Sequence, residues 1–259
     1  MAAFTSKRRS TILEELSRNR SVRVADLSIS LGVSEVSIRR DLQIMEEQGK
    51  LKRVHGGAVS LESTSAFTLQ ALHQDAQREK KERIGRAAAA MVRHGESLIF
   101  DSGSTPLQVA RHLDKELLNS GNLTAVTAYL PVVRQLGPCP GVHLILLGGI
   151  YVPAYEVLVG PQTVEQLKGL HVDKMFLGTD GMTLSHGFTT ANVLEAEVDR
   201  AMVQAATEVI VVSDSSKIGG IGLATIMPVS GIDKLITDTE APMDFVAALR
   251  ELGIEVILV

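Results

Sequence analysis

Apolar residues recur at helical spacing near the N-terminus and then gather in short continuous runs through most of the chain. In residues 6–18, Ile12, Leu13 and Leu16 fall on one side of a helix. From Ser97 onward the apolar runs are SLIFD, LTAVT, VHLILLGG, KMFLGTD, EVIVVSD, KLITD and IEVILV, and helical stretches separate them. Continuous Val, Ile and Leu runs are typical of parallel strands buried on both faces. We therefore expect an α/β, Rossmann-like fold here, with helices on both sides of the sheet.

The N-terminal residues show a different order of elements. The pattern predicts a first helix over 6–18, a short β-branched strand over 21–24 and a second helix over 25–31. Gly32 follows the second helix, and glycine ends a helix at little cost because it adopts the left-handed conformation without strain. These elements are the first half of a compact helical module.

A third helix and a β-hairpin complete this module. Ser34 is a favourable N-cap for the helix SEVSIRRDLQIMEEQG. After it, residues 51–54 and 58–60 read as two strands turned by Gly56 and Gly57. Two short helices followed by a hairpin predict a winged helix-turn-helix domain.

Polar and charged side chains lie off the apolar face that Ile38, Leu42 and Met45 form on the third helix. In a helix-turn-helix this helix enters the major groove of DNA, and wing cations contact the flanking phosphates. Residues 1–58 hold 11 lysines and arginines against 7 acidic residues, whereas the rest of the chain holds 15 against 23. The candidate DNA-binding residues are Ser34, Glu35, Ser37, Arg39, Arg40, Lys52, Arg53 and His55. The alternatives are a helical bundle with solvated arginines and a winged-helix module that binds protein.

The pattern divides the chain into three parts. Residues 1–60 form the winged helix-turn-helix DNA-binding domain, 61–77 a polar linker, and 78–259 an α/β effector-sensing domain. The last part begins with a strongly helical segment over 78–95, whose buried stripe includes Ile84. We expect the lysines and arginines of this segment on its solvated face.

The loop after the first apolar run has the composition of an anion-binding site. In LIFDSGSTPLQVA a strand leads into small and hydroxyl residues and then into a helix opened by Pro106. Proline is favoured at the first helical position, and backbone N–H groups at a helix N-terminus hold anions. Ser102, Ser104 and Thr105 add hydroxyl groups, so the loop predicts a phosphate cradle. An ordinary N-capped turn is the alternative.

Residues suited to ligand binding also follow the other predicted strands. The carboxyl ends of parallel strands meet at one edge of a sheet, where α/β proteins bind ligands. Lys217 would neutralise phosphate charge there, and aspartates such as Asp214 would accept hydrogen bonds from sugar hydroxyl groups. The candidate effector-binding residues are Asp101, Ser102, Gly103, Ser104, Thr105, Thr127, Gly148, Gly149, Asp180, Glu195 and Lys217.

Several other classes of site are disfavoured. No G-x-G-x-x-G follows a strand and no G-x-x-x-x-G-K-[ST] occurs, which argues against dinucleotide and P-loop sites. There is no Cys/His cluster, and we expect neither a metal nor a cofactor. The single cysteine, Cys139, excludes an internal disulfide framework and fits a reducing compartment. No apolar run reaches the roughly 20 residues of a membrane span, and the N-terminus lacks a signal peptide. We therefore expect a cytoplasmic protein.

Taken together, these motifs resemble one known family. SEVSIRRDLQIMEEQGKLKRVHGGAV is similar to the N-terminal signature of DeoR-type transcriptional regulators. DSGST, LLGG, FLGTDGM, HGFTT, LEAEV and SDSSK resemble the effector domain of that family, in matching order. The resemblance covers about residues 6–238. It implies a repressor of carbohydrate catabolism genes, whose effector domain is similar in fold to ribose-5-phosphate isomerase and CoA transferases.

The resemblance also implies the partners. They are a double-stranded DNA operator, a phosphorylated sugar effector and further copies of the chain, as a dimer or tetramer, without a membrane. The phosphate cradle would be residues 102–105. Two departures concern the rest of the effector site: Ala128 stands where the family usually has asparagine, and Val152 lies where an arginine often follows the double glycine. At these two positions the family's side chains are therefore not carried over to this chain.

Two other functions fit parts of the pattern. A sugar-phosphate isomerase or deaminase with an accessory DNA-binding domain would need a general acid or base, for which Asp180 and Glu195 are the candidates. No second carboxylate or histidine stands at a spacing that compels this interpretation. A nucleotide-based redox sensor would share the two-domain order, but the glycine fingerprint is missing.

Overall fold

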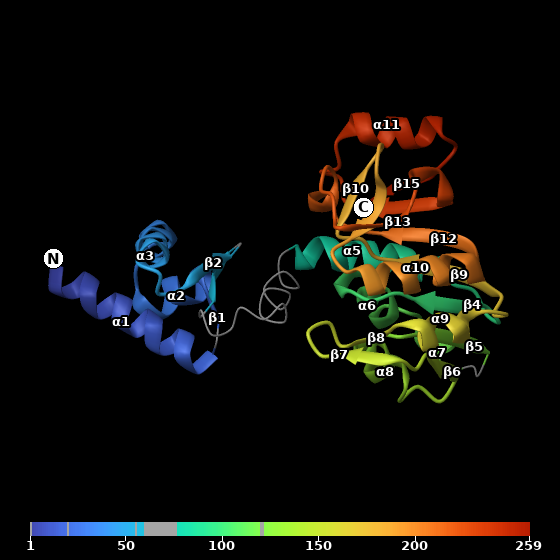
Figure 1. Ribbon diagram of the computed structural model, residues 1–259, viewed down its shortest axis with the longest axis horizontal. Coiled ribbons are helices and arrows are strands. Elements are labelled where there is room, and N and C mark those ends of the chain that lie inside the picture. The colour runs from blue at the N-terminus through green and yellow to red at the C-terminus, as the bar shows by residue number, and fades with distance from the viewer. Residues whose placement is uncertain (1, 20, 55, 60–76, 120–121) are drawn as a thin grey trace. The chain divides into compact units, whose positions relative to one another are not determined.

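The computed structural model describes residues 2–19, 21–54, 56–59, 77–119 and 122–259 (Figure 1). The chain forms two compact units, Met1–Ala76 and Gln77–Val259. The predicted linker lies outside the described residues except for Gln77, and so does the wing residue His55. The predicted domain boundaries stay predictions.

In the N-terminal unit, the helices and the first strand follow the predicted order. Helix α1 spans Ala2–Asn19, strand β1 Ser21–Arg23 and helix α2 Val24–Leu31. Gly32 ends α2 with a φ of 62°, the left-handed conformation that was expected. The third helix can therefore start in a new direction directly after the turn.

Helix α3 and the wing complete the unit. Helix α3 spans Glu35–Glu47, and its N-cap Ser34 accepts a hydrogen bond from the Ser37 amide. The wing strands β2 (Lys52–Val54) and β3 (Gly57–Val59) pair antiparallel, and β1 pairs with the other edge of β3. This is the predicted winged helix-turn-helix. Its core combines side chains from the three helices, from β1 and β3, and from Leu51 just before β2: Ile12, Leu16, Val22, Val24, Leu27, Ile38, Leu42, Met45, Leu51 and Ala58.

Seven parallel strands form the central sheet of the C-terminal unit. They are β4 (Ser97–Phe100), β5 (Leu123–Thr127), β6 (Val142–Leu146), β9 (Val172–Leu177), β12 (Ala206–Val212), β14 (Lys234–Thr237) and β15 (Glu255–Leu258). Each corresponds to one of the seven predicted runs. The spatial order is β15-β14-β12-β9-β4-β5-β6. From β4 the chain proceeds outward to β6, and it then returns to β9 on the other side of β4. The topological switch point therefore lies between β4 and β9, where α/β sheets bind ligands.

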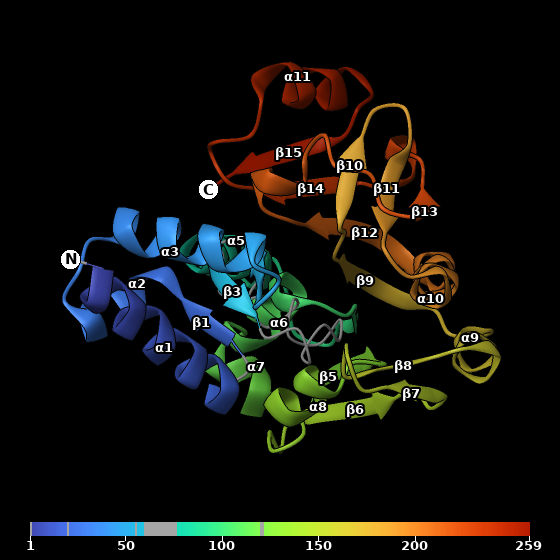
Figure 2. The ribbon, with the colours of Figure 1, turned by 60° about the vertical axis from the view of Figure 1, so that its left-hand side comes forward.

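Helices cover both faces of this sheet, as predicted (Figure 2). One face carries α5 (Arg78–Ala89), α6 (Ser104–Arg111) and α8 (Leu130–Leu136), while α9 (Pro161–Leu167) and α10 (Val193–Ala205) pack together on the other. The short helix α7 spans Lys115–Asn119, and α11 (Met243–Glu251) packs beside β15. The first helix ends at Ala89, earlier than predicted.

Helices α5 and α6 approach each other closely at Gly85. A Cβ atom on Gly85 would lie 2.6 Å from the Cβ of Gln108, nearer than real Cβ atoms come to one another. Glycine is therefore required for this helix contact. The contact matters for the site, because α5 and α6 both begin at the carboxyl edge of the sheet.

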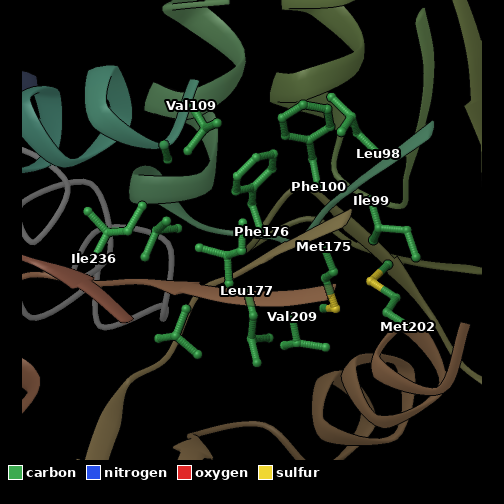
Figure 3. Close-up of a cluster of buried hydrophobic side chains, with 14 of the residues drawn as sticks. Leu98, Ile99, Phe100, Val109, Met175, Phe176, Leu177, Met202, Val209 and Ile236 are labelled. Carbon is green, nitrogen blue, oxygen red and sulfur yellow. The ribbon is translucent and has the colours of Figure 1, made fainter. Parts of the chain in front are cut away.

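The core of the C-terminal unit lies between the sheet and its helices. Phe100 and Phe176 point to one face, beneath Val109 of α6, and their ring centroids lie 5.6 Å apart (Figure 3). Met175 points to the opposite face, toward Met202 of α10 (Figure 3). Burial of strand side chains on both faces explains why the strand runs are almost continuously apolar.

Two smaller sheets were not predicted. Strands β7 (Ile150–Val152) and β8 (Val157–Val159) form a hairpin. Strands β10 (Gly181–Thr183), β11 (Gly187–Thr190) and β13 (Ala224–Met227) form an antiparallel sheet that follows the end of β9. These strands are too short to show a period in the sequence.

The start of α6 differs from the prediction. The helix begins at Ser104, so Pro106 is its third residue rather than its first. The physical reason is that every amide of a first helical turn lacks a partner within the helix, so proline is tolerated throughout that turn. Within the described part of the chain, no helix has the length and apolarity needed to cross a membrane.

Candidate functional site

The outer side of α3 gathers most of the residues predicted to bind DNA. Val36, Arg39, Arg40 and Gln43 are exposed along this side, away from the buried face of the helix. Arg39 donates to the Glu35 carboxylate at 2.5 Å, one turn away along the helix. The pair steadies both side chains, although an exposed pair of this kind contributes only a few tenths of a kcal/mol.

Ser34 and Ser37 form the N-terminal cap of α3. Their hydroxyl groups lie 3.1 Å apart, and the Ser34 hydroxyl accepts from the Ser37 amide at 3.4 Å. This cap fixes where α3 begins, and hence which side chains its first turn presents. Lys52 and Arg53 lie on wing strand β2. The roles predicted for all these residues in DNA binding stay predictions.

The inner side of α3 carries a charged residue that the sequence pattern did not reveal. Asp41 is buried, and its two oxygens accept from Arg8 at 2.6 Å and from Arg9 at 2.8 Å. Two arginines of α1 are thus committed to holding α1 against the recognition helix. The basic charge counted in the sequence is correspondingly less available to a polyanion.

In the C-terminal unit, Asp101 links the two strands of the topological switch point. It follows β4, and its carboxylate accepts from the Ser102 amide at 2.6 Å and from the Gly178 amide, after β9, at 2.9 Å. Burial raises the pKa of Asp101 to about 6, although these hydrogen bonds act in the opposite direction. Asp101 therefore fastens the predicted phosphate loop to the neighbouring strand end.

Helix α10 brings two more carboxyl groups to this point. Burial, together with the charges of Asp101 and Asp180, raises the pKa of Glu195 to about 8. Asp199, one turn along α10, is 5% exposed and shares a side-chain hydrogen bond with Asp101. Burial and the charge of Asp101 hold the pKa of Asp199 well above its ordinary value. Asp199 accordingly holds the proton of this pair and donates to Asp101.

The position of Glu195 is set by the start of its helix. Asn192 caps α10 by accepting from the Leu194 amide at 2.9 Å, and its own amide group donates to the Glu195 carboxylate at 3.2 Å. Asp180 lies nearby and accepts from the Ala191 amide at 2.9 Å. We call Asp101, Asp180, Glu195 and Asp199 the carboxyl cluster.

The carboxyl cluster carries less negative charge than its four acids suggest. At neutral pH Glu195 holds a proton because its pKa is about 8, and burial and the charge of Asp101 raise the pKa of Asp199 as well. Protonated carboxyl groups donate hydrogen bonds, so this edge of the sheet offers both donors and acceptors to ligand oxygens. Among the described residues, no group of three or more His, Cys, Asp or Glu side chains is arranged to hold a metal ion.

A second group of charges lies at the ends of β12 and β14. Lys80 contacts Asp238 at 3.1 Å and Glu240 at 2.7 Å, which ties the start of α5 to the end of β14. The next residue, Lys81, is only 6% exposed. Burial lowers the pKa of Lys81, while nearby Asp214 raises it and Lys217 lowers it.

This arrangement corrects the expectation of a solvated face for two cations of the first helix, whereas the arginines of the segment are exposed as expected. Lys80 forms an ion pair with Asp238 after β14, and the buried Lys81 lies near Asp214 after β12. Lys81 and the predicted Lys217 place two positive charges around Asp214. Ammonium groups at this edge of the sheet are suited to an anionic ligand group.

The remaining predicted residues lie in the phosphate loop, at the end of β5 and after β6. In the phosphate loop, Gly103 has a φ of 107° and leads directly into α6, where Thr105 is buried. Thr127 is fully buried; its hydroxyl donates to the Phe100 carbonyl at 2.7 Å and accepts from the Tyr129 amide at 3.1 Å. The Thr127 hydroxyl is therefore engaged within the protein.

Gly148 and Gly149 adjoin α9. The Gly148 amide donates to Gln166 at 3.0 Å, and the Gly148 carbonyl accepts from Thr163 at 2.8 Å. These bonds fix the backbone after β6. For all eleven residues, a contact with the effector stays a prediction.

Sequence reasoning missed Asp41, Lys81 and Asp199, although each carried a positional signal. Asp41 follows Ile38 by three residues, and Lys81 precedes Ile84 by three, so each shares a buried stripe. Asp199 lies four residues after Glu195, which places both carboxyl groups on one side of α10. A charged residue on an apolar stripe was the sign of a buried partner.

Comparisons with known proteins agree with these two units. A model described as the DeoR-like helix-turn-helix domain matches residues 8–64, and one described as the DeoR C terminal sensor domain matches residues 76–239. The resemblance inferred from the motifs is thereby confirmed.

The chain is also similar to individual proteins over its whole length. It is 35% identical to a "Putative aga operon transcriptional repressor" of Escherichia coli O157:H7, covering 98% of this chain and 94% of that protein. It is 33% identical to the "HTH-type transcriptional regulator GolR" of Listeria innocua, covering 98% of each.

A solved ribose 5-phosphate isomerase from Plasmodium falciparum shares 18% identity over 55% of this chain and 54% of that one, with a TM-score of 0.40. A likeness this distant assigns neither a ligand nor an activity.

Proposed function

Because this chain belongs to the DeoR family of DNA-binding transcriptional regulators, we propose that it represses carbohydrate catabolism genes until a phosphorylated sugar releases it from its operator. The family consists of regulators rather than enzymes, so the isomerase alternative is set aside. Two relatives are named as a repressor of an aga operon and as the regulator GolR. The first of these names supports the direction of control proposed for this chain.

One observation carries the proposal of an anionic effector. Lys81 is buried near Lys217 and Asp214, so two ammonium groups lie at this end of the sheet. Ammonium groups form strong, charge-assisted hydrogen bonds with phosphate oxygens. In the proposed complex the phosphate group lies beside these two lysines, and the sugar extends toward the carboxyl cluster. The helix N-terminus at Ser104 adds backbone donors.

Release of DNA would follow from linkage between the two sites. If a phosphorylated sugar binds the DNA-free arrangement more tightly, it lowers operator affinity by the same factor by which DNA lowers sugar affinity. The typical coupling in such systems is about 1–3 kcal/mol, or roughly 5–150-fold. We further propose that the chain acts in the cytoplasm as a homo-oligomer, a dimer or a tetramer, because helix-turn-helix proteins read paired half-sites.

The effector proposal is tested by a thermal-shift screen of pentose and hexose phosphates on the full chain. We expect at least one compound to raise the melting temperature and to release operator DNA in a gel shift. Lys81→Met, which keeps the length of the side chain but removes its charge, should abolish both effects. Lys168→Met is the matched control, since Lys168 is exposed and pairs with Glu165 on the surface. Equal responses of the Lys81→Met variant and the native protein would refute the assigned anion site.

The DNA-binding assignment is tested by Arg40→Ala. We expect operator affinity at fixed salt to fall roughly 5–150-fold, the equivalent of one base or phosphate contact at about 1–3 kcal/mol. Arg78→Ala is the control, because Arg78 is an exposed arginine of the C-terminal unit that pairs with Glu82. Unchanged affinity in Arg40→Ala and in Arg39→Ala would contradict the choice of recognition helix.

A further inference from the structure

Val36 is an apolar residue whose exposure has no explanation in the packing of its helix. Its side chain is 72% exposed, and it lies in the first turn of α3. The buried face of α3 is formed by Ile38, Leu42 and Met45 on the other side of the helix. A β-branched residue also lowers helix propensity slightly. Neither the core nor the helix accounts for a valine at this position.

The polar side chains around Val36 are occupied with one another. Ser34 and Ser37 form the helix cap, with their hydroxyl groups 3.1 Å apart. Glu35 and Arg39 form an ion pair across one turn. Val36 therefore presents its two methyl groups uncovered, between polar groups that already have partners.

The position of Val36 places it where a recognition helix reads bases. Residues near the N-terminus of this helix reach base edges in the major groove. Arg40 lies one turn further along the same exposed side, at a spacing of four residues. The only apolar group on a base edge in the major groove is the C5-methyl group of thymine. In a helix, valine adopts mostly one side-chain rotamer, so its methyl groups are held ready for such a contact.

We infer that Val36 contacts the C5-methyl group of a thymine and makes α3 select thymine at one position in each half-site. The inference rests on the proposed operator binding by α3. It assigns a specificity role to a residue that has neither charge nor hydrogen-bonding groups.

The test begins with selection of binding sites from random-sequence duplex DNA by the full chain. Each dT of the selected half-site is then replaced singly by dU, which removes only the methyl group. At one position we expect the native protein to lose about fourfold in affinity, the equivalent of one buried methyl group. In Val36→Ser, replacement of dT by dU at that position should have no effect, while all other positions behave as before.

Ile29→Ser is the matched control. Ile29 is 83% exposed in the same unit but lies on α2, so this variant should keep the native response at every thymine. The inference is overturned if no dT to dU replacement weakens the native protein, or if Val36→Ser retains the native pattern. Failure of the native protein to select any DNA sequence would instead refute the proposed operator binding itself.

Discussion

Replacing Glu195 by glutamine tests the electrostatics of the carboxyl cluster. Glu195 lies near Asp101 and Asp180, and burial is the main reason that its pKa rises from 4.5 to about 8. Glutamine keeps the size of the side chain and can still accept from Asn192, but it cannot ionise. The variant therefore removes one titration and leaves the packing of α10 in place.

The sign and size of the effect follow from proton linkage. Above the ordinary pKa of glutamic acid the unfolded chain has lost the proton, whereas the folded chain retains it until the pH approaches 8. The folded state binds more protons in this window, so the contribution of Glu195 to the free energy of unfolding falls as the pH rises. At about 1.4 kcal/mol per tenfold change in proton affinity, the loss is about 4 kcal/mol between about pH 5 and about pH 8.5. Glu195→Gln should therefore gain that much stability relative to the native protein over the same range.

The chain itself provides a selective probe for this measurement. It has no tryptophan, and its three tyrosines, Tyr129, Tyr151 and Tyr155, all lie in the C-terminal unit. Tyrosine fluorescence during urea unfolding of the full chain thus reports on that unit alone. The quantity to compare is the difference in unfolding free energy between Glu195→Gln and the native protein at each pH.

Glu197→Gln is the control, because Glu197 is an exposed residue of the same helix. Its difference from the native protein should stay nearly constant with pH. A constant difference for Glu195→Gln as well, or one that decreases with rising pH, would show that Glu195 ionises freely in the folded protein. The description of the carboxyl cluster as proton-bearing would then be wrong.

Two further substitutions test contacts that position the sites. Asp41→Asn leaves Arg8 and Arg9 opposite a neutral group, and since both arginines are partly solvated we expect a loss of about 2 kcal/mol, less than for a fully buried pair. Hydrogen–deuterium exchange of α1 and α3 should show the corresponding loss of protection, and unchanged protection would contradict the role given to Asp41. Gly85→Ala places a methyl group against Gln108, so α5 and α6 must separate at a cost of about 1–3 kcal/mol. Its urea midpoint by tyrosine fluorescence should fall, and a midpoint equal to that of the native protein would show that the helices tolerate a Cβ there.

The hydrophobic pattern was sufficient to predict the main architecture. All seven runs became strands of the parallel sheet, because residues buried on both faces must be apolar at nearly every position. The recognition helix was equally clear, since the cap Ser34, the left-handed Gly32 and the apolar face at Ile38 all act within a few residues of one another. Local interactions of this kind depend on residues close together in the chain, so they can be predicted from the sequence.

The motifs also identified the family. They matched both units in the correct order, and comparison with known proteins confirmed the assignment. The strand-end rule placed Asp101 at the carboxyl edge of the sheet, and the structure added its hydrogen bond there to the Gly178 amide after β9. That success depended on topology alone, because parallel strands must end at a common edge.

The hydrophobic pattern could not predict the shortest strands. The strands of the β10–β11–β13 sheet have three or four residues each, too few to show alternation. They form because β13 arrives from a distant part of the chain to pair with β11. Their existence is a consequence of the fold rather than of local propensity.

The amino-acid sequence by itself determined the two-unit organisation, the parallel sheet, the recognition helix and the family. Only the tertiary structure decided which charged residues are buried and what they face. Lys81, Asp41 and Asp199 have side chains that normally lie in water. Asp41 is buried against arginines of α1, Lys81 is buried near Asp214, and Asp199 is buried in a hydrogen bond with Asp101. The ionisation and hydrogen bonding of such groups depend on distances between segments far apart in the chain, and those distances exist only once the chain has folded.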